Sequence, residues 1–393
     1  MLILAVVGIV VVLPWLVLGA HFGTASPGSR ADAGGIRLTP EAAKQKSHTP
    51  GPKASPSATQ TSPSPTQTSP SPTQPSPTPT QVAQSTPSGY RLTWAPPALV
   101  NPTTVNLCDC NINSGKIIVN LAIGQDYVLK DSVALHYPVQ IKGGHNVVWI
   151  GGDIAPSSGP DIAIQIGWGA GTGGGTIHLE GIYLHGYLTD GIEGGEYAGL
   201  YKPSGTLADA TLQIENVRID GITGDSRVNH QDCIQHYGGW KYLRVDHFTC
   251  HSPYQGFEIP WEDGASNNQG VLSNWDLRNA NLYDMAPTGL SFQTLIHFGD
   301  RNGTFNATTH GQRGNLLNVY LRATQRSCDQ ETYPNSGSSS SDGTTVHSTM
   351  NAGGTITWAN AWAVYGFVTP GVPPGGDFVP LGVDGVGYVT PGW

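Results

Sequence analysis

Two short stretches of the chain gather side chains that can transfer protons. Residues 229–236 read NHQDCIQH and place an aspartate and a cysteine between two histidines. Residues 250–259 read CHSPYQGFEI and contain a second cysteine and a glutamate. Histidine exchanges protons near neutral pH, and paired carboxyl groups act as general acid and general base. The candidate catalytic residues in these stretches are His230, Asp232, His236 and Glu258.

The same residues also have structural interpretations. Aspartate often accepts backbone N–H bonds at turns, so Asp232 and the earlier Asp190 can cap strand ends without any catalytic role. The histidines can be solvated surface groups, and Glu258 can be one rung of a polar ladder. Spacing alone therefore leaves catalysis and structure as open alternatives for each residue.

Polar and aromatic side chains around the two stretches are expected to bind substrate. Binding sites combine apolar or aromatic walls with a few polar groups that fix the orientation of the ligand. We expect substrate contacts from Glu193, Arg218, Gln235, Tyr237, Arg244, Gln255 and Trp261.

The composition of the chain indicates a β-rich exported protein. The 393 residues include 52 glycines and 30 prolines, and only 12% of them are charged. The net charge is −9 and no basic block occurs, which argues against a nucleic-acid partner. An acidic protein also gains no long-range attraction to an anionic polysaccharide, so only a local basic patch would hold one.

The N-terminal part indicates export followed by a linker. Residues 1–20 are almost entirely apolar, with no charge between Leu2 and Leu18, which is a length at the short limit for a bilayer span. We expect residues 1–25 to be a signal peptide or a membrane anchor, and residues 26–89 to be a disordered Pro/Ser/Thr-rich linker. The folded part is then secreted or anchored on the outer cell surface, and it contacts a membrane only through the N-terminal segment.

The five cysteines limit the kinds of site that the chain can form. They contain no CxxC pair, which argues against a zinc ribbon or a thioredoxin-type site. An odd number leaves at least one cysteine outside intramolecular disulfides, and export makes disulfides chemically permissible. The cysteines are Cys108, Cys110, Cys233, Cys250 and Cys328.

The folded part, from about residue 90, repeats a unit of two strands. Apolar residues alternate with polar ones in short runs, and the unit recurs every 31 to 35 residues. This period, without a helical pattern between the strands, indicates a β-solenoid. An all-β sandwich is the alternative, but it would not predict repeated two-strand units. Equivalent inward positions are Ile177, Leu212, Leu243 and Trp275, and then Ile182, Val217, Phe248 and Ala280.

Stacked coils would align equivalent residues in columns. We expect an apolar core column of Ile192, Ile234, Phe257 and Leu290. Alternation would direct their polar neighbours outward onto one flat exposed face, which would suit a linear polysaccharide. The expected outward columns are Glu193, Gln235, Glu258 and Ser291; Glu180, Glu215, Asp246 and Arg278; and His178, Gln213, Arg244 and Asp276.

These runs resemble the single-stranded right-handed parallel β-helix of the pectin-lyase-like superfamily. The resemblance covers about 117–325, and DYVLKD and PVQIKGGHNVVWIGG look like the first coils. We therefore predict an all-β protein with a right-handed parallel β-helix over 90–325. Residues 326–393 would form a loop and a Gly/Pro-rich cap over the open end of the solenoid. We expect this protein to be a monomer.

The motif residues resemble those of the polygalacturonase family within that superfamily. Its members carry Asn-Thr-Asp-Gly, Asn-Gln-Asp-Asp-Cys and Cys-Ser-Gly-Gly-His-Gly segments on successive coils, similar to LTDGIE, NHQDCI and CHSPYQGFEI here. The resemblance implies a disulfide between Cys233 and Cys250. It also implies that Asp190 and Asp232 are the carboxyl pair of an inverting glycosidase.

The chain departs from the polygalacturonase pattern at several positions. Gln231 replaces one of the paired acids, Gln255 replaces the family's histidine, and the later Arg-Ile-Lys segment has no clear counterpart. The resemblance therefore implies the fold and part of a site. Our leading hypothesis is that Asp232, with Asp190 or Glu258, hydrolyses a polysaccharide without a metal or another cofactor. His230 or His236 would adjust the pKa of the catalytic acid or bind substrate.

Two other functions remain open. The first is a non-catalytic glycan-binding protein or adhesin on the cell surface, in which the acids are structural. The second is a calcium-dependent polysaccharide lyase, because Ca²⁺ takes 6–8 oxygen ligands and the chain offers a column of acids near two arginines. That column is Glu180, Glu215 and Asp246, and the arginines are Arg218 and Arg244.

Overall fold

The computed structural model describes most of the chain from Arg91 to the C-terminus. The described residues are 91–157, 161–167, 175–194, 210–223, 231–236, 240–259, 274–285, 294–298, 313–324, 327–328, 332–333, 347–359 and 364–393. The predicted export segment and linker lie outside these ranges, as do His230, Tyr237 and Trp261. Within the ranges, no helix has the length and apolar character needed to cross a membrane.

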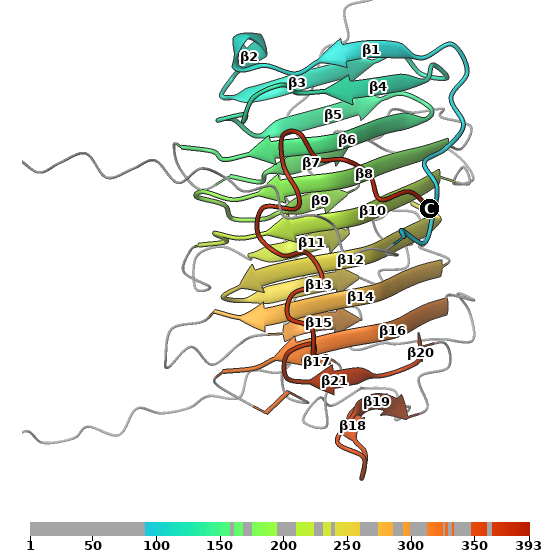
Figure 1. Ribbon diagram of the computed structural model, residues 1–393, viewed down its shortest axis with the longest axis vertical. Helices are drawn as coiled ribbons and strands as arrows, with labels where there is room; N and C mark the ends of the chain where they lie inside the picture. The colour runs from blue at the N-terminus through green and yellow to red at the C-terminus, as the bar shows by residue number, and fades with distance from the viewer. Residues whose placement is uncertain are drawn as a thin grey trace, which may run out of the picture. The chain divides into compact units, whose positions relative to one another are not determined.

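The strands stack into two long parallel sheets (Figure 1), in which each strand pairs with the equivalent strand of the next coil. The predicted all-β parallel β-helix is therefore confirmed. Sheet A contains β1 (Thr103–Asn106), β4 (Tyr127–Lys130), β6 (Val147–Ile154), β8 (Gly175–Leu184), β10 (Ala210–Ile219), β12 (Tyr242–Ser252), β14 (Asn274–Asp284) and β16 (Arg313–Arg322). Sheet B contains β3 (Lys116–Leu121), β5 (Val139–Gly143), β7 (Ile164–Gly167), β9 (Ile192–Gly194), β11 (Asp232–His236), β13 (Gln255–Ile259) and β15 (Thr294–Phe298).

Short elements extend the sheets at both ends of the stack. A 3-10 turn, η1 (Asp109–Asn111), precedes β2 (Ile112–Asn113), which pairs antiparallel with β3. At the other end, β17 (Thr332–Tyr333) extends sheet B, and β20 (Val364–Tyr365) and β21 (Val368–Pro370) pair with β16. β19 (Ile356–Ala359) pairs antiparallel with both β18 (His347–Met350) and β21.

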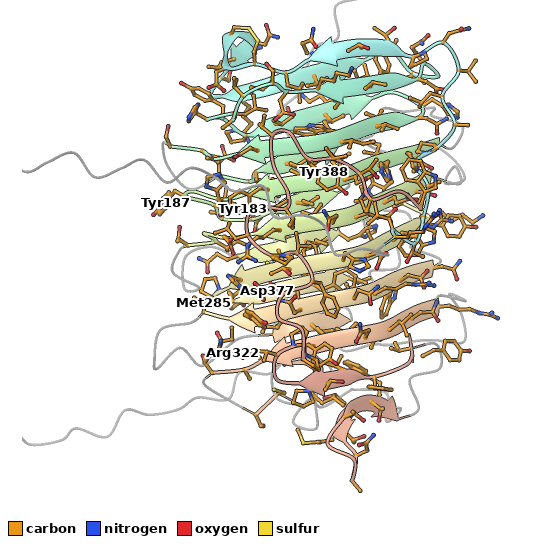
Figure 2. All side chains as sticks on the ribbon, in the orientation of Figure 1. Tyr183, Tyr187, Met285, Arg322, Asp377 and Tyr388 are labelled. Atoms are coloured by element: carbon orange, nitrogen blue, oxygen red, sulfur yellow. A yellow bond between two sulfur atoms is a disulfide. The ribbon has the colours of Figure 1, made fainter. Side chains whose placement is uncertain are left out.

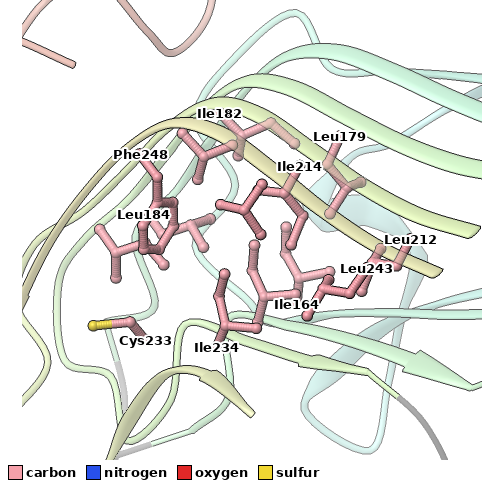
Figure 3. Close-up of a cluster of buried hydrophobic side chains, with 14 of the residues drawn as sticks. Ile164, Leu179, Ile182, Leu184, Leu212, Ile214, Cys233, Ile234, Leu243 and Phe248 are labelled. Carbon is pink, nitrogen blue, oxygen red and sulfur yellow. The ribbon is translucent and has the colours of Figure 1, made fainter. Parts of the chain in front are cut away.

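Apolar side chains that point inward form the core in register. Ile177, Leu212, Leu243 and Trp275 pair with one another from β8 to β14, and each is at most 1% exposed. Leu212 and Leu243 of sheet A meet Ile234 of sheet B in the interior (Figure 3). Full burial of one such side chain contributes roughly 1.5–3 kcal/mol, so the repeated columns hold the coils together.

A bend divides the strands of sheet A at the same register position from β6 to β16. The bend residues have left-handed backbone, with φ values of +54° at Asn216, +49° at His247, +43° at Asn279 and +59° at Asn318. Glycine and asparagine tolerate this conformation best, which explains why the chain supplies them at the bend. His247 is the exception, and its Nδ1 lies 2.9 Å from Asp246 Oδ1.

Two segments outside the repeat cover sheet A. We call residues 91–98 the N-terminal strap and residues 371–393 the C-terminal strap. The C-terminal strap, red in Figure 1, runs back across the strands of sheet A toward β8 instead of ending as a cap. The two straps meet where Leu92 N donates to Gly392 O at 2.9 Å. Only part of the segment 326–393 therefore lies at the end of the stack, where β20 and β21 extend the last coil. The C-terminal strap continues away from that end and over sheet A.

The disulfide implied by the polygalacturonase resemblance is present. Cys233 at the start of β11 is bonded to Cys250 near the end of β12, with Cα atoms 6.2 Å apart. A second disulfide joins Cys108 to Cys110, so Cys328 is the cysteine outside both disulfides.

Removal of the Cys233–Cys250 disulfide is expected to destabilise the β-helix. The bond closes a loop with a sequence separation of 17 residues, and a loop of this size restricts the unfolded chain by roughly 3 kcal/mol. The double variant Cys233→Ala/Cys250→Ala should therefore lose about 3 kcal/mol in urea unfolding. Cys328→Ala serves as the control, and a double variant as stable as this control would contradict the prediction.

Candidate functional site

A column of polar side chains runs along the outer face of sheet B. We call Gln140, Gln165, Glu193, Gln235, Glu258 and His297 the outer column. Gln140 donates to Gln165, Gln165 Nε2 donates to Glu193 Oε2 at 2.9 Å, and Gln235 Nε2 donates to Glu258 Oε2 at 3.0 Å. Register pairing stacks these residues from β5 to β15, so neighbouring coils bring amides and carboxylates together.

A second column lies at the beginning of the same strands. We call Asp190, Asp232, Gln255 and Thr294 the start column. Asp232 pairs in register with Gln255, and Gln255 pairs with Thr294. The backbone N–H of Asp232 donates to Oδ1 of Asp190 at 2.8 Å, which fixes the Asp190 carboxyl beside the next coil.

His297 links the two columns, although it was not among the site residues predicted from the sequence. Its Nδ1 lies 3.3 Å from Gln255 Nε2 and 3.5 Å from Glu258 Oε1. The expected core column placed Leu290 and Ser291 on this coil, but Ile296 pairs with Phe257 and His297 pairs with Glu258. Leu290 and Ser291 lie outside the described residues. The apolar run LIHF at 295–298 was the signal that could have indicated the correct register.

Burial changes the protonation of Asp190. Asp190 is only 7% exposed, and this burial raises the pKa of its carboxyl to about 7. The hydrogen bond from Asp232 N–H opposes this increase, whereas the nearby charges of Glu193 and Glu258 add to it. Asp190 is therefore a carboxyl group that keeps its proton up to nearly neutral pH and lies within electrostatic reach of two other acids.

The other acids of the site are also shielded from water. Asp232 is fully buried and Glu258 is 5% exposed. Burial likewise raises the pKa of Glu193, although Gln165 and Lys116 oppose the increase. The site therefore combines one acid held protonated near neutral pH with further carboxyls on adjacent coils. Acid–base catalysis needs such a pair of groups.

His236 does not have the properties that suggested it as a catalytic residue. Alternation along β11 directs Ile234 and His236 inward and Gln235 outward. Burial lowers the pKa of His236 to about 4, so the imidazole is neutral at physiological pH. A histidine of this kind packs at the edge of the core, and it is not the group that exchanges protons near pH 7.

The two arginines expected to bind substrate lie on sheet A instead of sheet B. Arg218 Nε donates to Asp220 Oδ2 at 2.6 Å, and its Nη1 donates to Asp377 Oδ2 at 2.7 Å and to the Val379 carbonyl at 2.8 Å. Arg244 donates to Gln213 at 3.3 Å and lies over the Trp94 ring. Both arginines therefore fasten the straps to sheet A, whereas the start column belongs to sheet B.

The expectation that all outward columns share one exposed face is wrong for sheet A. His178, Glu180, Glu215 and Asp246 are completely buried, and the straps use the last three as anchors. The anchoring hydrogen bonds are Thr93 N to Asp246 at 2.9 Å, Trp94 N to Glu215 at 3.2 Å, and Tyr388 Oη to Glu180 at 2.9 Å. Segments without a repeat pattern make these contacts, so periodicity could not reveal them.

The acidic column considered for calcium is thus engaged in holding the straps. Among the described residues, no group of three or more His, Cys, Asp or Glu side chains is arranged to hold a metal ion. The carboxylate oxygens of Glu215 and Asp246 instead accept bonds from backbone N–H groups and from Gln213 and Asn279.

Comparison with known proteins adds no family to these observations. The chain matches no family model, and no curated protein or solved structure shows significant similarity to it. The stacked parallel strands establish a β-solenoid architecture by themselves. Any closer relationship rests on the residues of the motif.

Proposed function

We propose that this protein is an exported polysaccharide hydrolase of the polygalacturonase-like type, with its site on sheet B, where the start column and the outer column meet. Asp190 would be the general acid and Asp232 the general base, with Glu258 as the alternative partner. The observation that carries the proposal is the hydrogen bond that fixes the Asp190 carboxyl one coil from Asp232, at a place where burial, Glu193 and Glu258 raise its pKa to about 7. An inverting glycosidase needs this combination of a protonated and an ionised carboxyl.

The polar columns suggest a neutral polymer as the substrate. The residues of the outer column and the start column include carboxyls, amides and a histidine, but neither lysine nor arginine. A uronate chain would place further negative charge beside these acids, and the nearby Lys116 already pairs with Asp161 at 3.0 Å. Gln235, Gln255 and His297 would instead bind sugar hydroxyls around the scissile bond.

The contacts of the acids also favour a second candidate function. Asp232 exposes none of its surface, and Asp190 accepts a backbone N–H bond, as a purely structural aspartate does. In that case the protein would be a non-catalytic glycan-binding protein or adhesin on the cell surface. The motif residues would then serve only to hold adjacent coils in register.

Incubation of the full chain with a panel of neutral and acidic polysaccharides tests the proposal. Reducing ends and absorbance from unsaturated products are followed together, with and without calcium. We expect new reducing ends without new absorbance, and loss of this activity in Asp232→Asn. Asp276→Asn, on sheet A, is the matched control and should keep the activity.

Each other outcome points to a different function. New absorbance that disappears on chelation would identify a lyase and contradict hydrolysis. No product from any polymer, together with retained binding to one of them, would support the glycan-binding alternative. Undiminished hydrolysis by Asp232→Asn would show that the reaction occurs elsewhere on the molecule.

A further inference from the structure

A pocket of about 380 Å³ lies between sheet A and the C-terminal strap. Its floor comes from the bend of the sheet A strands, at His247, Asn318 and Tyr320, and its wall comes from residues 373–391 of the strap. No residue of the outer column or the start column lines it. The volume is within the range of small-molecule sites, so the pocket can accept a ligand of one or a few rings.

Aromatic rings and prolines form the apolar surface of this pocket. The ring centroids of Tyr320 and Phe378 are 6.0 Å apart, and His247 meets Phe378 edge-on at 6.1 Å. Tyr388, labelled on the strap in Figure 2, presents its ring because its hydroxyl donates to Glu180. The prolines of the lining are Pro373, Pro374, Pro380 and Pro391.

The polar groups at the pocket are uncharged or already neutralised. Asp377 lines the pocket, but Arg218 Nη1 donates to it at 2.7 Å and Asn281 Nδ2 donates to it at 3.3 Å. Asn318 donates one N–H to Asn279 at 2.8 Å, and among the described residues its amide oxygen and second N–H have no other hydrogen-bond partner. The pocket therefore suits a neutral ligand that offers both donors and acceptors.

We infer that this pocket is a second, non-catalytic binding site for a neutral sugar unit. The apolar C–H face of a sugar packs on aromatic rings, and its hydroxyls both donate to and accept from an amide. The inference rests on the proposed function only in the choice of a polysaccharide as the ligand. The pocket would hold one part of a long polymer while sheet B engages another, and two linked contacts bind more tightly than either alone.

A proline-rich peptide is the competing ligand, because aromatic grooves also bind polyproline II segments. The linker of this chain, residues 26–89, is rich in proline. Such a peptide presents mainly carbonyl acceptors, and it needs hydroxyl or N–H donors above the rings. Proline has no N–H to donate to the Asn318 amide oxygen, whereas a sugar hydroxyl can donate to it and accept from its N–H, which favours the sugar.

Titration of the full-length Asp232→Asn protein with neutral hexasaccharides tests the inference. The probes are β-1,4-glucan, β-1,3-glucan, xylan and mannan hexamers, measured by calorimetry. We expect at least one of them to bind. Phe378→Ala and Asn318→Gly should each raise its Kd on the order of tenfold. Glycine at 318 keeps the left-handed backbone and removes only the amide.

Phe367→Ala is the matched control, because Phe367 is 48% exposed and lies outside the pocket lining. Failure of all four hexamers to bind, or binding that neither pocket variant weakens, would overturn the inference. Tighter binding of a synthetic peptide of residues 61–80, weakened by Phe378→Ala, would assign the pocket to the linker. Thermal melting checks that each variant folds, and Asn318→Gly decides the matter if Phe378→Ala does not fold.

The two proposals fail in different ways. Loss of hexamer binding in the pocket variants, without any hydrolysis by the native chain, would keep the sugar pocket and reject the hydrolase. Hydrolysis of soluble hexamers that is unchanged in Phe378→Ala, without binding at the pocket, would keep the hydrolase and reject the pocket.

Discussion

Asp190→Asn is expected to slow hydrolysis on the order of a thousandfold, because it removes the proposed general acid. Asparagine keeps an oxygen that can accept the Asp232 N–H bond, so the fold should be unchanged. The loss should therefore appear in kcat while the melting temperature stays close to that of the native protein. Initial rates at saturating polymer, together with melting curves, measure both quantities.

The pH dependence of the native enzyme provides a second measurement on the same residue. A general acid must be protonated, and the pKa of Asp190 is raised to about 7. The rate should therefore fall as the pH rises through about 7. Glu193→Gln is the sharper variant, because the Glu193 charge raises the pKa of Asp190. Its removal should move the fall in rate to lower pH without abolishing activity.

Two results would contradict this role for Asp190. A native rate that does not change through neutral pH would show that Asp190 does not supply the proton. Native activity in Asp190→Asn would show that Asp190 has only a structural role, as the acceptor of the Asp232 backbone N–H. Gln140→Leu, which removes an outer-column residue that bonds to Gln165 and touches neither Glu193 nor Asp190, is the matched control for disturbance of the column.

The repeat made the core of this protein predictable from its sequence. Strand alternation has a period of two, and each coil repeats the pattern of the last, so Ile177, Leu212, Leu243 and Trp275 could be aligned by inspection. The register failed at β15, where the expected strand lay a few residues too early in the chain. The segment before Thr294 has no strong alternation to correct this placement.

Coverage of the outward columns could not be predicted in the same way. Glu180 and Glu215 alternate outward like the residues of the outer column on sheet B. They are buried because Tyr388 and Trp94 arrive from opposite ends of the chain. Such contacts depend on the path of segments that do not repeat, and periodicity contains no information about that path.

Raising the pH is expected to weaken the attachment of both straps and to destabilise the protein. Burial raises the pKa of Glu215 and of Asp384 to about 8 each. Asp246 and Glu180 add to the increase at Glu215, and Asp220 and Asp153 add to it at Asp384, whereas Arg218 opposes it there. Carboxyls of the unfolded chain have pKa values of about 4. The folded chain therefore holds protons between about pH 4 and 8 that the unfolded chain has released, and stability falls across this window.

Other groups act in the opposite direction only at lower pH. The pKa of Asp220 is lowered to about 2 by His251 and Arg218 against the effect of burial, so its contribution is lost below about pH 4. His236, whose pKa is lowered to about 4, binds a proton more readily in the unfolded chain and reduces stability between about pH 6.5 and 4. The melting temperature should accordingly be highest near pH 5 and lower at pH 9, by on the order of 10 °C.

Asp384→Asn and Glu215→Gln separate the contributions of the two straps. Each substitution removes one buried carboxyl that must ionise, so each variant should lose less stability than the native protein between pH 5 and pH 9. Asp109→Asn, at a carboxyl that pairs with His136 away from both straps, should leave the slope unchanged. Because Asp384 belongs to the strap that walls the pocket, Asp384→Asn should also keep sugar affinity at pH 9 that the native chain loses. A native melting temperature that rises from pH 5 to pH 9 would show that both carboxyls are ionised in the folded protein, and that the straps are held by their charged forms.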